Sequence, residues 1–163
     1  MKKLLCFLTF AIIIGSVYAN KQMVYYNYKA LSAEACRFQY SVTKQDTSYY
    51  IIVSILSIQV KFNSEPTMKI KTFNGDILTI QGDVDNTNRS PLGVVSWNVV
   101  LPISFSSAYF KVTPEQFEQL KCGVSKIRLS TTPVNHEKTF KKDKIGKKIY
   151  QFYIKEKSHD ENF

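Results

Sequence analysis

The chain has 163 residues, of which 44% are hydrophobic and 13% aromatic. These values fit one globular domain with its own core and argue against a second domain. The formal net charge of +9 at pH 7 indicates attraction to anionic surfaces but says nothing about the fold.

The first nineteen residues have the pattern of an export signal. Lys2 and Lys3 form a charged start, residues 4–15 form an apolar segment, and residues 17–19 are a small-x-small cleavage sequence. The apolar segment of about twelve residues is shorter than the roughly 20 needed to cross a membrane, and no later segment is long and apolar enough. We therefore expect a secreted or periplasmic protein that begins at Asn20.

Removal of this signal has a simple effect on charge. It takes away Lys2 and Lys3 and no acidic residue, which lowers the net charge from +9 to +7. Export argues against nucleic acid as a partner. The partners that a positive charge favours are then an acidic protein, an anionic glycan or another envelope surface.

The first half of the chain reads as strands. Residues 23–28 are aromatic and expected to be extended, and residues 36–42 alternate apolar with polar side chains, as a half-buried strand does. A polar connection at 44–47 leads to a central strand that is apolar at both alternating positions from Tyr49 to Val53. We predict that this strand continues to Phe62.

A hairpin follows the central strand. If residues 73–75 form a three-residue loop with Gly75 in the left-handed conformation, Ile70 faces Leu78 and apolar residues meet across the two strands. A two-residue Asn-Gly turn would instead set Ile70 against Thr79. The sequence therefore favours the three-residue loop.

Apolar residues alternate again from Val95 to Phe105, which predicts one strand. Pro102 cannot donate a ladder hydrogen bond, so we place it at an edge or a bulge. The apolar set changes phase after Ser106 and Ser107, which predicts a bulge or break there.

Helix signals appear in the last third. Residues 113–116, Thr-Pro-Glu-Gln, form a capping box with proline at the first helical position, and Gly123 is placed to end that helix after about Lys121. After a strand at 127–131, residues 141–156 carry an apolar stripe of helical period, which Gly146 weakens. The stripe comprises Ile145, Ile149, Phe152 and Tyr153. A strand over 149–154 is the alternative.

These elements predict an α+β fold. We expect an antiparallel twisted sheet of six or seven strands with the two helices of the C-terminal third packed on it. Residues 20–163 would form this single domain, with a frayed C-terminal tail.

The C-terminal part also resembles a known group. Residues 113–121 (TPEQFEQLK), 126–129 (KIRL) and 140–150 (FKKDKIGKKIY) resemble the last part of small exported domains of unassigned function from Bacteroides-type bacteria. The resemblance covers roughly the last fifty residues. It supports the fold and implies no catalytic or binding residues.

The residues that catalysis needs are few. His136 is expected in a loop and His159 in the polar tail, and neither has a His or Cys at metal-ligand spacing. We expect no cofactor, no metal site and no enzyme activity. The alternative is an exported hydrolase that uses loop carboxylates, because such partners meet only in space.

Two groups of side chains are candidates for binding. Lys144, Lys147 and Lys148 would lie on the polar side of the last helix, and tyrosines 25, 26 and 28 would present rings for stacking. We therefore expect an exported, non-catalytic binding or interaction domain. An inhibitor or immunity-type protein is a variant of this hypothesis that differs only in its partner.

Two cysteines remain after signal removal. Cys36 and Cys122 would form a disulfide that export permits, or would stay as two buried thiols on an apolar strand face and beside a helix end. The sequence leaves both alternatives open.

The export signal leads to a first prediction. The mature protein should lack residues 1–19, and its intact mass should correspond to a chain that starts at Asn20. Mass spectrometry of protein recovered from the exported fraction measures this. A mass that still includes Cys6 would contradict the prediction.

Overall fold

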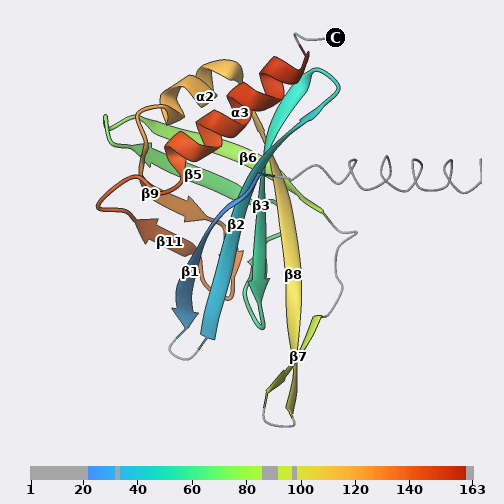
Figure 1. Ribbon diagram of the computed structural model, residues 1–163. Coiled ribbons are helices and arrows are strands. Elements are labelled where there is room, and N and C mark those ends of the chain that lie inside the picture. The colour runs from blue at the N-terminus through green and yellow to red at the C-terminus, as the bar shows by residue number, and fades with distance from the viewer. Residues whose placement is uncertain (1–21, 32–33, 86–91, 97–98, 161–163) are drawn as a thin grey trace, which may run out of the picture.

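The computed structural model describes residues 22–31, 34–85, 92–96 and 99–160. They form an α+β fold in which a large antiparallel sheet curls beneath two helices (Figure 1). The predicted signal peptide lies outside the described residues. Within the described ranges, no helix has the length and apolar character needed to cross a membrane.

The main sheet has the strand order β1-β2-β3-β8-β6-β5-β9-β11, and β7 pairs with β8 as a ninth strand. A separate small sheet joins β10 to β4. The helices are α2 (Pro114–Leu120) and α3 (Gly146–Asp160). The strands are β1 Val24–Leu31, β2 Glu34–Gln45, β3 Ser48–Ser57, β4 Lys61–Phe62, β5 Thr67–Thr72, β6 Ile77–Asp85, β7 Leu92–Ser96, β8 Val99–Val112, β9 Val124–Leu129, β10 Thr131–Thr132 and β11 His136–Thr139.

The predicted strand count of six or seven was too low. The single strand expected from Val95 to Phe105 is instead a hairpin of β7 and β8, in which Val95 pairs with Val100. When the alternation of apolar and polar residues continues through both strands of a hairpin, the sequence looks the same as that of one long strand. The other added strand of the main sheet is β11, which has four residues and carries almost no periodic signal, and the same holds for β4 and β10 of the small sheet.

The strand β3 lies between β2 and β8, as the sequence predicted for a buried central strand. Ile51, Ile52 and Val53 are all buried, so this strand is covered on both faces. Its predicted extension to Phe62 was wrong, because β3 ends at Ser57. The Ser57 hydroxyl accepts hydrogen bonds from the backbone N–H groups of Gln59 at 3.2 Å and Val60 at 2.7 Å and turns the chain there.

The hairpin of β5 and β6 has the register predicted from the three-residue loop. Ile70 pairs with Leu78, Met68 with Ile80, and Lys69 with Thr79. Gly75 has a φ of 97°, the left-handed conformation that this loop requires.

The bulge expected at Ser106 and Ser107 is absent from the described pairing of β3 with β8. The register runs without a shift from Tyr49 opposite Val112 to Ser57 opposite Ser104. The Ser54 and Ser107 hydroxyls lie 2.9 Å apart across the two strands, and the Ser106 hydroxyl accepts from the Phe62 N–H at 3.2 Å. The serines therefore satisfy polar groups within a continuous strand.

The helix α2 matches its prediction, since Thr113 and Gln116 form a complete capping box and Gly123 follows in the left-handed conformation.

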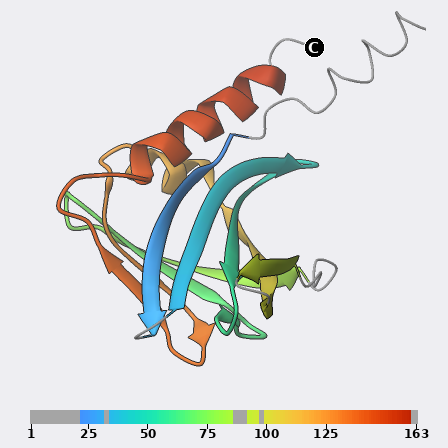
Figure 2. The same ribbon diagram turned by 60° about the horizontal axis from the view of Figure 1, so that its bottom comes forward.

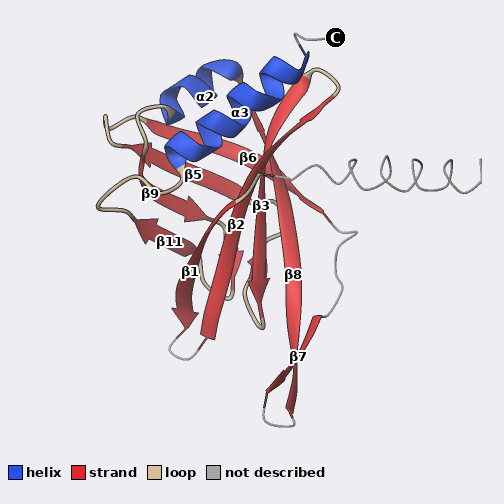
Figure 3. Cartoon of the chain, viewed as in Figure 1, coloured by secondary structure: helices blue, strands red, loops and turns tan. Residues whose placement is uncertain are grey.

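The two helices cover one face of the sheet (Figure 3). Three aromatic rings join them to it. Phe117 of α2 stacks on Tyr153 of α3 with ring centroids 4.3 Å apart, and the ring edge of Tyr49 from β3 meets both.

The helix α3 begins five residues later than predicted and extends through His159, which was expected in a frayed tail. Ile149 and Tyr153 are buried, Phe152 is half-buried, and the strand alternative was wrong. Gly146 is the first helical residue rather than an interior one. A Cβ atom at this position would lie 2.7 Å from the Val124 backbone nitrogen, so the close approach of α3 to β9 requires glycine.

The curl of the sheet brings its two edge strands, β1 and β11, toward each other (Figure 2). Tyr26 Oη of β1 lies 2.6 Å from His136 Nε2 of β11 and 2.8 Å from Tyr40 Oη of β2. The His136 ring stacks on Phe38 with centroids 3.8 Å apart. His136 was expected in a loop, but it is a buried strand residue that joins the two ends of the sheet.

The environment of His136 predicts a pH dependence of stability. Burial lowers its pKa to about 4, and the positive charge of Lys138 adds to the shift. The unfolded chain, with an ordinary pKa of about 6.5, then binds a proton that the folded chain does not. The free energy of unfolding should therefore decrease as the pH falls through this interval, by about 2 kcal/mol between about pH 7 and pH 5.

Denaturant unfolding at a series of pH values measures this effect. The matched control is His136→Phe, which keeps a ring against Phe38 but has no group that titrates. The variant should lose less stability than the original chain over the same interval. Parallel losses in the two proteins would contradict the role of His136.

Candidate anion-binding site

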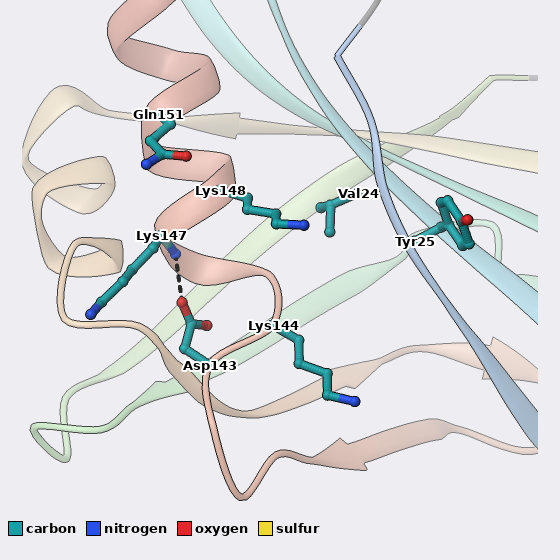
Figure 4. Close-up of a pocket in the computed structure, with 7 residues that line it drawn as sticks. All are labelled: Val24, Tyr25, Asp143, Lys144, Lys147, Lys148 and Gln151. Atoms are coloured by element: carbon teal, nitrogen blue, oxygen red, sulfur yellow. Dashed lines mark hydrogen bonds between the residues drawn. The ribbon is translucent and has the colours of Figure 1, made fainter.

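A depression of about 490 Å³ lies between β1 and the first half of α3 (Figure 4). Lysine side chains of α3 and of the turn before it border the depression on one side, and β1 borders it on the other. The Val24 side chain extends toward the helix, whereas the Tyr25 ring extends from β1 away from it (Figure 4). The lining residues are Val24, Tyr25, Asp143, Lys144, Lys147, Lys148 and Gln151.

The start of α3 is held in place by Asp143. Its Oδ1 atom accepts from the backbone N–H groups of Val124 at 2.9 Å, Gly146 at 2.8 Å and Ile145 at 3.3 Å, and its Oδ2 atom accepts from Lys147 N–H at 2.8 Å. Burial opposes the ionised form, but these four donors together hold the pKa of the carboxyl below its usual value. Asp143 therefore acts as a cap that ties α3 to the start of β9.

The three predicted lysines all line the depression and are exposed. Lys144 and Lys148 extend toward β1, whereas Lys147 extends away from it on the other side of the helix (Figure 4). Two of the three ammonium groups are thus directed at the space between the helix and the strand.

The tyrosines of β1 separate into two environments. Tyr25 is 62% exposed, and the Arg37 guanidinium carbon lies 5.3 Å from its ring centroid, in cation–π geometry. Tyr26 faces the interior, where it stacks with Phe38 and Tyr40, so it does not present a surface for stacking. The backbone of Tyr28 belongs to β1, but its side chain lies outside what the structure describes.

Sequence reasoning missed three contributors. Asp143 was not singled out, although an Asp three residues before a helix is a recognisable cap signal. Gln151 follows Lys148 at i+3 and Lys147 at i+4, so it lies one turn further along the helix, next to both. Arg37 had no signal in the sequence, because its position beside Tyr25 depends on the register of β1 and β2, which pairs Tyr25 with Gln39.

The arrangement is suited to binding an anion. Two lysines approach one space, an arginine lies next to the exposed tyrosine, and the lining contains one carboxylate, Asp143, which accepts four backbone hydrogen bonds. Within residues 22–31, 34–85, 92–96 and 99–160, no group of three or more His, Cys, Asp or Glu side chains is arranged to hold a metal ion.

In the structure Cys36 and Cys122 are free thiols, Cys36 buried and Cys122 partly buried. Cys36 is buried on β2 with its Sγ atom 3.5 Å from Ser57 Oγ. Cys122 follows α2, and its Sγ atom accepts from Asn74 Nδ2 at 2.9 Å.

Comparison with known protein families, curated proteins and solved structures gave no match to this chain. The resemblance of the C-terminal part to exported Bacteroides-type domains stays a prediction, and the site is interpreted from its own geometry.

The cap at Asp143 leads to a prediction for stability. Asp143→Ala removes the acceptor of four backbone donors and should lower the free energy of unfolding by about 1–2 kcal/mol. Asp143→Asn should cost less, because its amide oxygen can still accept. Denaturant unfolding measures both, with Glu65→Ala as a control that removes an acidic charge from an exposed position. Equal effects of Asp143→Ala and Glu65→Ala would contradict the capping role.

Proposed function

We propose that this protein is an exported, non-catalytic domain that binds an anionic ligand in the depression between β1 and α3. One observation carries the proposal: Tyr25, near the start of the described chain, and Lys144 and Lys148, near its end, line the same depression. Concave sites with a few converging polar groups are the usual form of ligand sites, and 490 Å³ lies within their usual volume.

The local charges support this proposal. Within the part of the chain that the structure describes, no ion pair joins Lys144 or Lys148 to a carboxylate. The Asp143 carboxylate is engaged with the backbone instead. A ligand that carries a carboxylate, sulfate or phosphate would supply the negative charge that this space lacks.

The neighbouring side chains favour an acidic saccharide. The exposed ring of Tyr25 lies on the side of β1 that faces away from the lysines, so it can stack on a further sugar ring of a chain that crosses this edge strand (Figure 4). The Gln151 amide can both donate to and accept from hydroxyl groups. An acidic protein, as an inhibitor or immunity-type protein would bind, needs the lysines but not the aromatic ring. A substitution of Tyr25 therefore distinguishes an acidic saccharide from an acidic protein as the ligand.

A hydrolase remains the less favoured function. Glycoside hydrolysis generally needs two carboxyl groups on opposite sides of the scissile bond. Among the described residues, the lining of the depression contributes one carboxylate, Asp143, and its two oxygens already accept four backbone hydrogen bonds.

The different directions of the lysine side chains allow a test of the proposal. The double variant Lys144→Gln, Lys148→Gln should weaken binding of oligogalacturonate about tenfold at low salt, since each exposed charge contact contributes up to about 1 kcal/mol. Lys147→Gln is the matched control, because its side chain points away from β1, and it should change affinity little (Figure 4). Isothermal titration calorimetry measures both, with neutral oligosaccharides as the uncharged comparison.

Tyr25→Ala tests the choice of ligand. It should weaken binding of the acidic saccharide but leave capture of an acidic polypeptide such as polyglutamate nearly unchanged. If the double variant Lys144→Gln, Lys148→Gln binds every anionic probe as tightly as the original chain, the depression is not the anion-binding site.

A further inference from the structure

A second basic surface lies on the opposite side of the sheet from the helices. In β9, Ile127 and Leu129 point into the core and are fully buried, so Lys126 and Arg128 lie on the outer face. Lys69 and Lys71 occupy the same outer face of β5, where they alternate with buried residues. We call these four side chains, together with Ile77 and Phe73, the outer basic face.

The pairing of β5 with β9 places like charges directly opposite each other. Lys69 pairs with Arg128, and Lys71 pairs with Lys126. Directly opposite side chains on antiparallel strands have Cβ atoms about 5 Å apart, and like charges in this position destabilise a sheet. The arrangement therefore works against folding to the extent that no anion offsets it.

One carboxylate of the domain partly offsets these charges. Glu137 of β11 lies 2.7 Å from Lys126 Nζ and 3.1 Å from Arg128 Nε. With four cations and this one anion, the face keeps an excess of three positive charges. Lys69 and Lys71 lie one strand further from Glu137 than Lys126 and Arg128 do.

Apolar side chains adjoin these cations. Ile77 lies directly opposite Lys71 and is 68% exposed, and Phe73 in the adjacent loop is 45% exposed. A shallow groove of about 290 Å³ lies over this region. Its lining combines charged with apolar residues, namely Lys69, Lys71, Lys126, Arg128 and Glu137 with Ile70 and Ile77. The surface thus combines positive charge with exposed hydrocarbon.

We propose that the outer basic face docks this protein on a membrane surface that contains anionic phospholipid. The four cations would meet lipid phosphates, and Ile77 and Phe73 would enter the boundary between headgroups and acyl chains. A broad sheet face can contact many headgroups at once. An acidic polypeptide matches the cations equally well but gives no reason for exposed hydrocarbon at the end of the hairpin.

This docking is independent of the proposed ligand site. The depression is built from β1 and α3, whereas the outer basic face belongs to β5, β6, β9 and the loop of the hairpin. A protein docked through the outer basic face can therefore still present the depression to a ligand.

Vesicle sedimentation tests the proposal with the mature chain. The protein should bind vesicles of phosphatidylcholine mixed with phosphatidylglycerol, bind pure phosphatidylcholine weakly, and dissociate as salt is raised. The variant Lys69→Gln, Lys71→Gln, Lys126→Gln should lower the partition coefficient at least about tenfold. The matched control Lys144→Gln, Lys147→Gln, Lys148→Gln removes the same total charge from α3 and should retain most of the binding.

A second variant separates a membrane from a soluble polyanion. Ile77→Ser with Phe73→Ser should weaken binding to the anionic vesicles and leave binding to polyglutamate unchanged. The lysine variant of the outer basic face should unfold at the same or a higher denaturant concentration than the original chain, because like-charge pairs are removed.

Three results would overturn the proposal. The first is an equal loss of vesicle binding in the two lysine variants, which would mean attraction by net charge alone. The second is vesicle binding that does not depend on Ile77 and Phe73. The third is binding of polyglutamate by the outer basic face without binding of anionic vesicles, which would identify an acidic protein as the partner.

Discussion

The contact between the two edge strands is the constraint on which the rest of the structure depends. The sheet curls far enough for Tyr26 of β1 to reach His136 of β11, and Phe38 lies stacked beneath the imidazole. A flat sheet would leave these rings in water. The curl buries them in one core that also includes the residues with which α2 and α3 pack.

The candidate site is a consequence of this arrangement. Its strand side is β1, whose place is set by the contact with β11, and its helix side is α3, whose first turn is set by Asp143. Neither element alone forms a depression. Asp143 keeps its negative charge while it caps the helix, and the region is positive because three lysines outnumber this carboxylate in the described lining.

Features that depend on neighbouring residues were predictable from the sequence. The register of β5 and β6 follows from one glycine in a three-residue loop, and the start of α2 follows from Thr113 and Gln116. Helical period correctly identified Ile149 and Tyr153 as the buried side of α3, although the start of the helix was placed five residues too early.

Features that depend on distant contacts were not predictable in the same way. His136 is a polar residue in a short strand, and only the curl of the sheet explains its burial. Serines were ambiguous for a related reason. Ser57 ends a strand, because its hydroxyl accepts a hydrogen bond from the backbone N–H of Val60 a few residues later. Ser107 lies within a strand, because its hydroxyl bonds to Ser54 on the neighbouring strand. The three lysines were found as a charged group, but the partner strand β1 and the neighbouring Arg37 required the three-dimensional arrangement.

The hairpin of β7 and β8 has a consequence for self-association. The part of β8 before Ser104 has no pairing with β3 and, among the described strands, pairs with β7 alone. A strand with one open side can accept a strand from another molecule, which is a common start of aggregation. Pro102 lies in this stretch and has no N–H to donate. The residue that the sequence placed at an edge or a bulge thus makes the strand a poor template for intermolecular pairing.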